Sequence, residues 1–468
     1  MNYKQILDEL FSILSTYKES DIEGKLLEYY PESELKKILD VEKSENLKDP
    51  EVLFQWIKKY LQYGVKTENK QFFNRMWTGS SIPSAMGEIV ASVSNTSSCT
   101  YESAPVSTIM EKYMIETVLK EVGFKNGEGQ MTTGSSNANM ISMLIARNIY
   151  GSEVIENGLF GNKKLIAFVN AESHYSMDKA ANIVGIGVNN LLKVPVGNDG
   201  GMDISKLELL IQEEQNKGNI VCYVGATAGT TVRGAYDNLL GLNKLKEKYN
   251  FWLHVDGAWG GSIIFSDTLR KKYLQGIKNV DSFTFDFHKM PGVALMCNIF
   301  LINNKPGSLN THCCIGSNEY IFNQDDESCH FPLDLGKNSL QCGSRVDSLK
   351  LFLEWKYYGK SGIAEKIERY YELIQYAEQY VHKSEELELA LPLESFNLCF
   401  VYKNNNLEKQ NTINKSIREN LYTSGKSLVG SSSIDGVYFM RLLVCNEYVH
   451  ESDIDQFFEN VIEEGRRI

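Results

Sequence analysis

Reactive side chains follow four short apolar runs of this sequence, each of which has the composition of a buried strand. Because ligands bind beyond the carboxyl ends of strands in open parallel α/β sheets, four such runs would bring these side chains to one edge. A lone Asp, Lys or His after a strand is more often a turn residue or a solvated group, but the coincidence of four favours a site. The residues are His174 after Lys164–Val169, Thr227, Thr230 and Thr231 after Ile220–Val224, Asp256 after Phe251–Val255, and His288-Lys289 after Ser282–Phe285.

A second feature is the run of small residues at 132–139, Thr-Thr-Gly-Ser-Ser-Asn-Ala-Asn, which precedes an apolar helical stretch at Met140–Tyr150. Small residues leave the backbone N–H groups open at a helix N-terminus, where the helix dipole favours an anion. The run therefore predicts a phosphate site, although Ser and Asn also cap many helices that bind nothing. It matches neither the P-loop nor the dinucleotide fingerprint, so ATP and NAD are not indicated.

The elements that would position these residues change in character along the chain. Residues 1–60 have apolar positions at helical spacing and predict a helical segment. In residues 61–345, β-rich runs alternate with amphipathic stretches, which indicates a large α/β domain around a mainly parallel sheet. Residues 346–468 predict a smaller α+β domain. The further elements expected are strands at Cys297–Ile302, Leu398–Tyr402 and Val437–Val444, and helices at Asp203–Lys217, Leu239–Tyr249, Lys350–Tyr358, Ile363–His382 and Asp453–Glu464.

Composition limits the classes of function that fit. Of the 468 residues, 43% are hydrophobic and 23% are charged, which is typical of soluble globular proteins. A net charge of −12 argues against a nucleic-acid partner, but a few basic residues can still form a cleft for an anionic small molecule. The nine cysteines lack paired CxxC spacing and indicate reduced thiols, with neither a disulfide framework nor a metal site. Without a signal peptide or a membrane-spanning run, we expect a cytoplasmic protein.

Several motifs stand in the same order as in a known enzyme family. They are Phe72-Phe73-Asn74, Asn95-Thr96, Thr100–Pro105, Ser173–Ser176, Gly229–Val232, His254-Val255-Asp256, Ala258–Gly261, His288-Lys289-Met290 and Gln341-Cys342-Gly343 with Arg345-Val346-Asp347. From Gln71 onward the chain resembles the group II decarboxylases that depend on pyridoxal 5′-phosphate (PLP), in their glutamate, cysteine-sulfinate and aspartate decarboxylase branch. The resemblance implies the fold-type I PLP-dependent transferase fold, and a homodimer whose site lies at the subunit interface.

The resemblance also implies a role for each residue at the predicted sheet edge. Lys289 corresponds to the lysine that holds PLP as a Schiff base, since a lysine in a desolvated pocket becomes a reactive amine. Asp256 would pair with the pyridine nitrogen of the cofactor, and His174 would stack on the ring. The other implied cofactor contacts are Thr231 and Ala258 at the ring, and Gly134, Ser135, Ser136 and His288 near the phosphate.

Two residues outside that edge complete the implied catalytic set. Arg441 matches the arginine that binds the substrate α-carboxylate, for which a planar guanidinium is well suited. Without the resemblance, Arg441 would be interpreted as part of a salt bridge at a strand end. Tyr320 falls where these decarboxylases carry a loop tyrosine that returns a proton to the substrate carbon. On its own, Tyr320 reads as a loop aromatic packed on a partner subunit.

Departures from the family pattern bear on the substrate. Trp77 and Ser97 resemble the cysteine-sulfinate branch, and the bulk of Trp77 favours a side chain as short as that of aspartate or cysteine sulfinate. Arg75 adds a cation for a distal acid, unless a neighbouring carboxylate neutralises it. Cys99 replaces an aromatic residue and widens the pocket again.

These observations predict a PLP-dependent decarboxylase of a small acidic amino acid, forming β-alanine from aspartate or hypotaurine from cysteine sulfinate. The alternatives are glutamate decarboxylation to γ-aminobutyrate, a PLP enzyme that does not decarboxylate, and a relative that keeps the fold as a scaffold without cofactor. Intact Lys289, Asp256 and His174 argue against the scaffold.

Overall fold

The computed structural model describes residues 2–41, 49–151, 153–161, 163–313, 320–322 and 333–468, and these form two compact units. One unit combines residues 1–79, 372–393 and 397–468, and the other combines 80–371 with 394–396. This division differs from the expected boundaries near 60 and 345. The N-terminal residues join the C-terminal ones because β1 (Phe72–Phe73) pairs in parallel with β11 (Leu428–Ile434).

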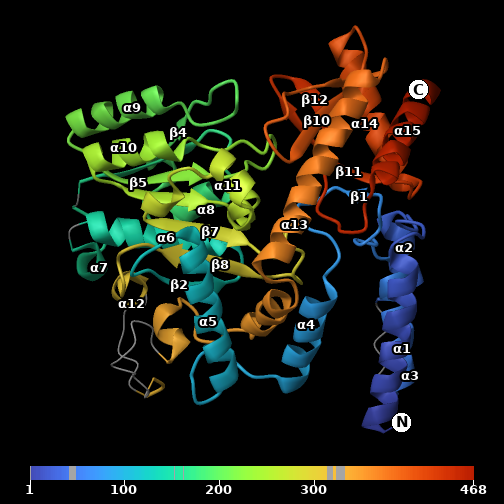
Figure 1. Cartoon of the computed structure of the whole chain (residues 1–468), viewed down its shortest axis with the longest axis horizontal. Coiled ribbons are helices and arrows are strands. Elements are labelled where there is room, and N and C mark those ends of the chain that lie inside the picture. Colours follow the sequence, from blue (N-terminus) through green and yellow to red (C-terminus); the bar gives the residue numbers. More distant parts are fainter. Residues whose placement is uncertain (1, 42–48, 152, 162, 314–319, 323–332) are drawn as a thin grey trace. The chain divides into compact units, whose positions relative to one another are not determined.

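The unit of residues 80–371 is built on a sheet with strand order β2-β8-β7-β6-β5-β3-β4 (Figure 1). The neighbours from β7 to β4 are parallel, whereas β8 is antiparallel to both β7 and β2. This arrangement confirms the predicted α/β fold with a mainly parallel sheet. The strands are β2 (Glu128–Thr132), β3 (Leu165–Asn170), β4 (Leu191–Val194), β5 (Ile220–Thr227), β6 (Trp252–Asp256), β7 (Ser282–Asp286) and β8 (Asn298–Ile302).

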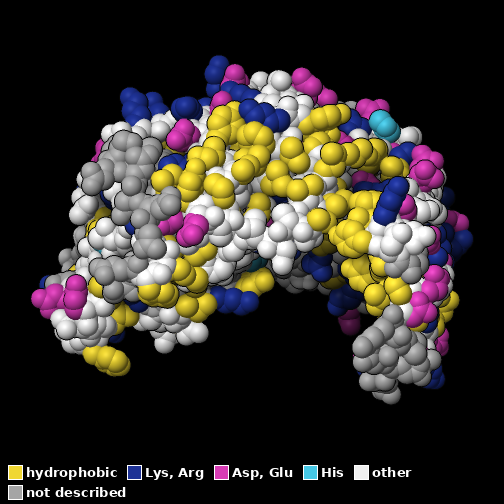
Figure 2. All heavy atoms as spheres, turned by 90° about the horizontal axis from the view of Figure 1, so that it is seen from below, with side chains coloured by type: hydrophobic (Ala, Val, Ile, Leu, Met, Phe, Trp, Pro, Cys, Tyr) yellow, Lys and Arg dark blue, Asp and Glu magenta, His cyan; other side chains and the backbone are white. Residues whose placement is uncertain are grey.

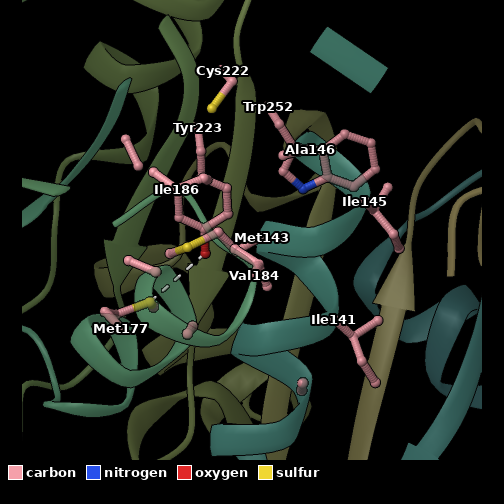
Figure 3. Close-up of a cluster of buried hydrophobic side chains, with 14 of the residues drawn as sticks. Ile141, Met143, Ile145, Ala146, Met177, Val184, Ile186, Cys222, Tyr223 and Trp252 are labelled. Carbon is pink, nitrogen blue, oxygen red and sulfur yellow. Dashed lines mark hydrogen bonds between the residues drawn. The ribbon is translucent and has the colours of Figure 1, made fainter. Parts of the chain in front are cut away.

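Burial on both faces explains why the central strands read as continuous apolar runs. Every residue of β6, β7 and β8 is buried. Helix α6 (Ser135–Tyr150) packs on the sheet through Ile141 and Ile145, next to Tyr223 of β5 and Trp252 of β6 (Figure 3). The Tyr223 hydroxyl donates to Met177 Sδ at 3.8 Å, so even the polar atom of this cluster has a partner. This packed core holds the ends of the strands in place.

Helices surround this sheet, and α6 contacts most of its strands. No helix among the described residues has a stretch long and apolar enough to span a bilayer. Short 3₁₀ turns lie at Val188–Asn190, Gly260–Phe265, Ile277–Asn279 and Leu335–Asn338. The other helices are α4 (Ile82–Ser94), α5 (Pro105–Val122), α7 (Val154–Asn157), α8 (Ser176–Ile183), α9 (Ile204–Asn216), α10 (Leu239–Tyr249), α11 (Asp267–Tyr273), α12 (Ser308–Cys313) and α13 (Asp347–Lys383), which bends at Gly359 and continues into the other unit.

The other unit contains a sheet with strand order β1-β11-β12-β10-β9 and has the α+β character expected of the C-terminal domain. Its N-terminal helix starts with a capping box, in which Asn2 and Gln5 exchange side-chain and backbone hydrogen bonds. The remaining elements are β9 (Leu387–Leu389), β10 (Asn397–Tyr402), β12 (Val437–Leu443), α1 (Tyr3–Asp21), α2 (Glu32–Leu39), α3 (Pro50–Tyr63), α14 (Leu407–Thr423) and α15 (Glu451–Arg467).

Glu111 of α5 is a buried carboxyl group that makes the stability of this fold depend on pH. Burial, opposed by a hydrogen bond from Met131 N–H and reinforced by the charge of Asp347, raises its pKa from 4.5 to about 7. A raised folded-state pKa means that the contribution of Glu111 to stability is complete below pH 4.5 and is lost as pH rises through 7. The full loss is about 3 kcal/mol.

We therefore expect Glu111→Gln to gain stability relative to the parent by about 3 kcal/mol between pH 4.5 and 8. Gln keeps the oxygen that accepts from Met131 N–H at 3.0 Å but cannot ionise. Urea unfolding of both proteins across this range measures the difference. A difference that stays constant with pH would show that folding does not shift the pKa of Glu111.

Candidate active site

Lys289 lies in the short connection between β7 and β8, and both ends of this connection are anchored. Asp286 pairs with Asn298 at the ends of the two strands, and Phe287 N–H donates to Cys297 O at 2.9 Å. The Lys289 side chain is 18% exposed, and its Nζ lies 3.0 Å from Asp286 Oδ2. The connection thus holds a partly accessible amine at the edge of the sheet.

Asp286 is the buried partner of this amine. Its Oδ1 accepts from Asn298 Nδ2 at 2.7 Å, from Ser135 Oγ at 3.0 Å and from Ser135 N–H at 3.2 Å. Burial raises the pKa of Asp286, but the charges of Lys289 and His288 outweigh it and hold the pKa below its ordinary value. The ionised carboxylate of Asp286 therefore faces the Lys289 amine, with Oδ2 3.0 Å from Nζ.

The predicted phosphate residues lie at the start of α6, which begins earlier than expected. Gly134 adopts φ 123°, a backbone conformation in which any side chain would be strained. Both Ser135 donors are directed at Asp286, whereas Ser136 is exposed at the helix end. The helix N-terminus at Gly134 and Ser136 can therefore receive an anion.

Asp256 ends β6 and is buried, with hydrogen bonds to both carboxylate oxygens. Asn139 Nδ2 of α6 donates to Oδ2 at 2.7 Å, and Ala258 N–H donates to Oδ1 at 3.0 Å. Each oxygen of this buried carboxylate thus has its own donor. The Asn139 and Ala258 donors together fix the orientation of Asp256 at the end of its strand.

The hydrogen-bond network also assigns the protonation of His254, the buried residue two positions before Asp256. Asn139 directs its amide nitrogen at the carboxylate, so its Oδ1 accepts from His254 Nε2 at 2.9 Å. The unprotonated Nδ1 then accepts from the Ser282 hydroxyl at 2.8 Å, whose oxygen accepts the indole N–H of Trp252 at 2.8 Å. Burial lowers the pKa of His254 to about 3, which matches a neutral ring.

His174 belongs to the same network through Ser176. Asn139 uses its second amide hydrogen to reach Ser176 Oγ at 3.0 Å, and Ser176 Oγ lies 2.9 Å from His174 Nδ1. Ser176 N–H also points at Nδ1, at 3.3 Å, so Nδ1 is the acceptor and Nε2 carries the proton. Burial lowers the pKa of His174, with Asp256 opposing and Lys289 adding to the effect. The structure therefore brings His174, Asp256 and Lys289 together.

The other predicted residues of this unit lie beside these. Thr231 and Ala258 are half-buried in the loops after β5 and β6, and His288 is buried with Nδ1 2.8 Å from Cys297 O. Ser97 Oγ accepts from Ser344 N–H at 3.2 Å, and Cys99 is buried next to Cys342. Tyr320 is 85% exposed. Its neighbour Glu319 lies outside the described residues.

The predicted substrate residues Arg441, Arg75 and Trp77 belong to the other unit. Arg441 of β12 is buried, donates from Nη2 to Asn74 O at 3.3 Å, and has a pKa lowered by burial. A Cβ on Gly430 of the neighbouring strand would lie 3.1 Å from Nη2, so this glycine makes room for the guanidinium. Arg75 is exposed, while Trp77 packs in an apolar cluster with its ring centroid 5.8 Å from that of Phe72.

The donor set in the large unit fits the cofactor that the sequence implies. PLP needs a lysine amine, an acid for its ring nitrogen, a flat group for its ring face and a helix N-terminus for its phosphate. Lys289, Asp256, His174 and the start of α6 could supply these four groups, and the φ of 123° at Gly134 requires glycine. Within the described ranges no cluster of His, Cys, Asp or Glu is arranged to hold a metal ion.

Asn139 and Asp286 organise the site, although neither was predicted as a site residue. A signal for each was present. Asn139 lies four residues after Ser135 and thus on the same face of the helix. Asp286 is the last residue of the strand that leads to Lys289.

Comparison with known proteins gives consistent matches along the chain. Residues 31–403 match the model of the pyridoxal-dependent decarboxylase conserved domain. The acidic amino acid decarboxylase GADL1 of Xenopus tropicalis is 33% identical over 475 aligned residues, covering 99% of this chain and 91% of that protein. Its Homo sapiens counterpart is 32% identical over 95% of this chain and 87% of its own length.

Solved structures are similar over nearly the full length. The crystal structure of mouse CSAD has a TM-score of 0.94 and 29% identity, and the alignment covers 99% of both chains. The structure of Oryza sativa TDC with PLP and tryptamine has a TM-score of 0.91 at 21% identity, which shows the shared fold.

Proposed function

Because this chain belongs to the pyridoxal-dependent decarboxylase family, we propose that it removes the α-carboxylate as CO₂ from a small acidic amino acid, aspartate or cysteine sulfinate. The observation that carries this proposal lies at one sheet edge, where Asn139 and Ser176 join Asp256 to His174 by hydrogen bonds and the charge of Lys289 reaches His174. The name of the Xenopus relative supports an acidic substrate. Glutamate, with a longer side chain, is the alternative.

The chain's own residues would act on the cofactor as follows. PLP, when bound, supplies an electron-accepting ring that stabilises the charge left on the α-carbon as CO₂ departs. Lys289 would hold it covalently through Nζ, and Asp256 would keep the ring nitrogen protonated. His174, neutral and fixed by Ser176, would cover one face of the ring and exclude water. The N-terminus of α6 at Gly134 and Ser136 would bind the phosphate, with Ser135 fixed by Asp286.

The substrate roles rest on the resemblance and on local chemistry. Arg441 would bind the α-carboxylate through its guanidinium, and Tyr320 would return a proton to the α-carbon after CO₂ leaves. By the resemblance, Ser97, Cys99, Arg75 and Trp77 would each influence the length or charge of the substrate side chain that is accepted. Trp77 has an apolar environment of its own, so its contribution to specificity would come from bulk.

Gly430→Ala tests the role of Arg441 and leaves the charge of the Arg441 guanidinium unchanged. The new methyl group would displace the guanidinium, whose Nη2 and Nε would lie 3.1 and 3.2 Å from it. We expect KM to rise by about tenfold, equivalent to about 1.4 kcal/mol of binding, with a smaller change in kcat. Gly436→Ala, at a turn with φ 81°, strains the same sheet without approaching Arg441 and is therefore the control for a loss of local stability. Equal changes in KM for both variants would contradict the assignment.

The substrate is tested by CO₂ release from the PLP-loaded protein given aspartate, cysteine sulfinate, cysteate and glutamate separately. Preference for the shorter acids would support the pocket proposed from Trp77 and Ser97. Preference for glutamate would mean that the wider space at Cys99 outweighs them. Absence of release from all four, with the cofactor bound through Lys289, would overturn the acidic substrate.

We also propose that the enzyme is a homodimer. Helix α4 carries an exposed apolar stripe at helical spacing, and α5 adds further exposed aliphatic side chains; apolar side chains gather over much of the face shown in Figure 2. Patches of this kind mark interaction sites. A particle mass of one chain by light scattering would contradict the dimer. The stripe consists of Ile82, Met86, Ile89, Val90 and Val93, and the α5 residues are Val106 and Ile109.

A cytoplasmic location remains our proposal. Cys99, Cys222, Cys297, Cys342 and Cys445 are free thiols, which is usual in a reducing compartment.

A further inference from the structure

Two cysteines far apart in sequence lie in contact in the large unit. Cys99 and Cys342 are separated by 243 positions, and their Sγ atoms are 3.8 Å apart. Cys99 is 7% exposed, whereas Cys342 is exposed. One thiol is thus open to solvent, and the second is buried directly behind it.

The backbone holds the two segments together independently of the thiols. Ser98 N–H donates to Ser344 O at 3.0 Å, and Gly336 N–H donates to Cys99 O at 2.8 Å. Bonding the sulfur atoms requires an approach from 3.8 Å to about 2.05 Å, a change that side-chain rotation supplies between fixed segments. The pair is therefore positioned before any reaction takes place.

We infer that Cys99 and Cys342 are a redox modification site, at which a hydroperoxide forms an intramolecular disulfide. In the first step, the Cys342 sulfur attacks the peroxide, the O–O bond breaks, and a sulfenic acid forms with release of water or an alcohol. In the second, the Cys99 sulfur attacks that sulfenic sulfur, the S–O bond breaks, and water leaves with the Cys99 proton. Both thiols are oxidised, and one hydroperoxide is reduced.

The different environments of the thiols set this order. Burial, with a contribution from Cys342, raises the pKa of Cys99 to about 11, so Cys99 is a poor first target at neutral pH. Once Cys342 is oxidised, contact at 3.8 Å compensates for the small thiolate fraction of Cys99, because the reaction has become intramolecular. Cys222 is not expected to react with the peroxide, because it is fully buried and its Sγ donates to Ile166 O.

This modification does not depend on the proposed substrate or on catalysis, and its test reads the bond directly. The PLP-loaded protein is treated with hydrogen peroxide, remaining thiols are blocked with N-ethylmaleimide, and the digest is analysed without reduction. We expect a linked pair of peptides containing Cys99 and Cys342, two hydrogens lighter than their sum. Dithiothreitol should separate them, and Cys342→Ser should abolish the link.

Cys445→Ser is the matched control, because Cys445 is a buried thiol whose Sγ is directed at Arg75 O. This variant should form the link as the parent does. The oxidised parent should also unfold at a temperature higher by on the order of a few degrees, since the bond closes a long loop, and oxidised Cys342→Ser should not. Over-oxidation of Cys342 with Cys99 still a thiol, or a disulfide from Cys342 to any other cysteine, would overturn the inference.

Discussion

Lys289→Ala is expected to lower CO₂ release by a factor of about 10³ or more and to leave bound PLP without a covalent link. Alanine removes the amine that Asp286 holds at 3.0 Å in the anchored connection between β7 and β8. Borohydride reduction followed by digestion should place the cofactor mass on the peptide containing residue 289 in the parent. The same peptide of the variant should be unmodified.

Lys305→Ala is a matched control for this experiment. Lys305 also pairs with an aspartate next to β7, since its Nζ lies 2.9 Å from Asp281 Oδ1. Its activity should stay within about twofold of the parent, as is usual when a partly exposed ion pair is removed. Parent-like activity of Lys289→Ala, or the cofactor mass on another lysine of the parent, would refute the assignment of Lys289.

Asp256→Asn is expected to lower CO₂ release by about 10²- to 10³-fold while the fold is kept. The Asn oxygen can accept from Asn139 Nδ2, which lies 2.7 Å from the carboxylate, but the amide nitrogen would then face Ala258 N–H, so we also expect some loss of stability. What is lost is the charge that would keep the ring nitrogen of PLP protonated. Single-turnover CO₂ release measures the effect, and the absorbance of bound PLP reports the change at the ring.

The control is Asp237→Asn, a second buried carboxylate close to the end of a strand. Asp237 accepts from Thr227 N–H, Met202 N–H and Asn170 Nδ2, and burial raises its pKa to about 6. An amide there would direct a donor at other donors, so we expect lower stability with kcat kept. If both variants lose kcat equally at a temperature where both are folded, loss of activity would not report a role of Asp256 at the cofactor.

The sequence predicted the central strands and the residues at their ends because burial on both faces makes these strands uniformly apolar. Strands β6 and β7 lie within one residue of the expected ranges, and their ends carry Asp256 and lead to Lys289. Strand β2 was missed, because its sequence Glu-Gly-Gln-Met-Thr is polar. It is a strand because it pairs with β8, a partner about 170 positions later in the chain.

The hydrogen-bond network could not be predicted in the same way. Asn139 and His254 are 115 positions apart, and only the folded chain shows that one amide reaches both His254 and Asp256. Helix α6 was expected to begin at 140 because its first turn is polar. The first turn of α6 is helical because residues at the sheet edge accept its hydrogen bonds. Asp286, for example, accepts from Ser135 N–H. Tertiary contacts thus decided what local propensity left open.

The unit formed by residues 1–79, 372–393 and 397–468 is discontinuous in sequence, and this has a consequence for synthesis on the ribosome. Phe72 leaves the ribosome long before Leu428, the residue with which it pairs in the sheet. At about 5–20 residues per second, the wait is roughly 20–70 s, during which the other unit can fold. The apolar side chains of Leu26 and Phe72, buried in the finished protein, stay uncovered on the nascent chain throughout. A truncated chain ending before β11 should therefore bind holdase chaperones through its first 79 residues, whereas the full-length chain escapes them.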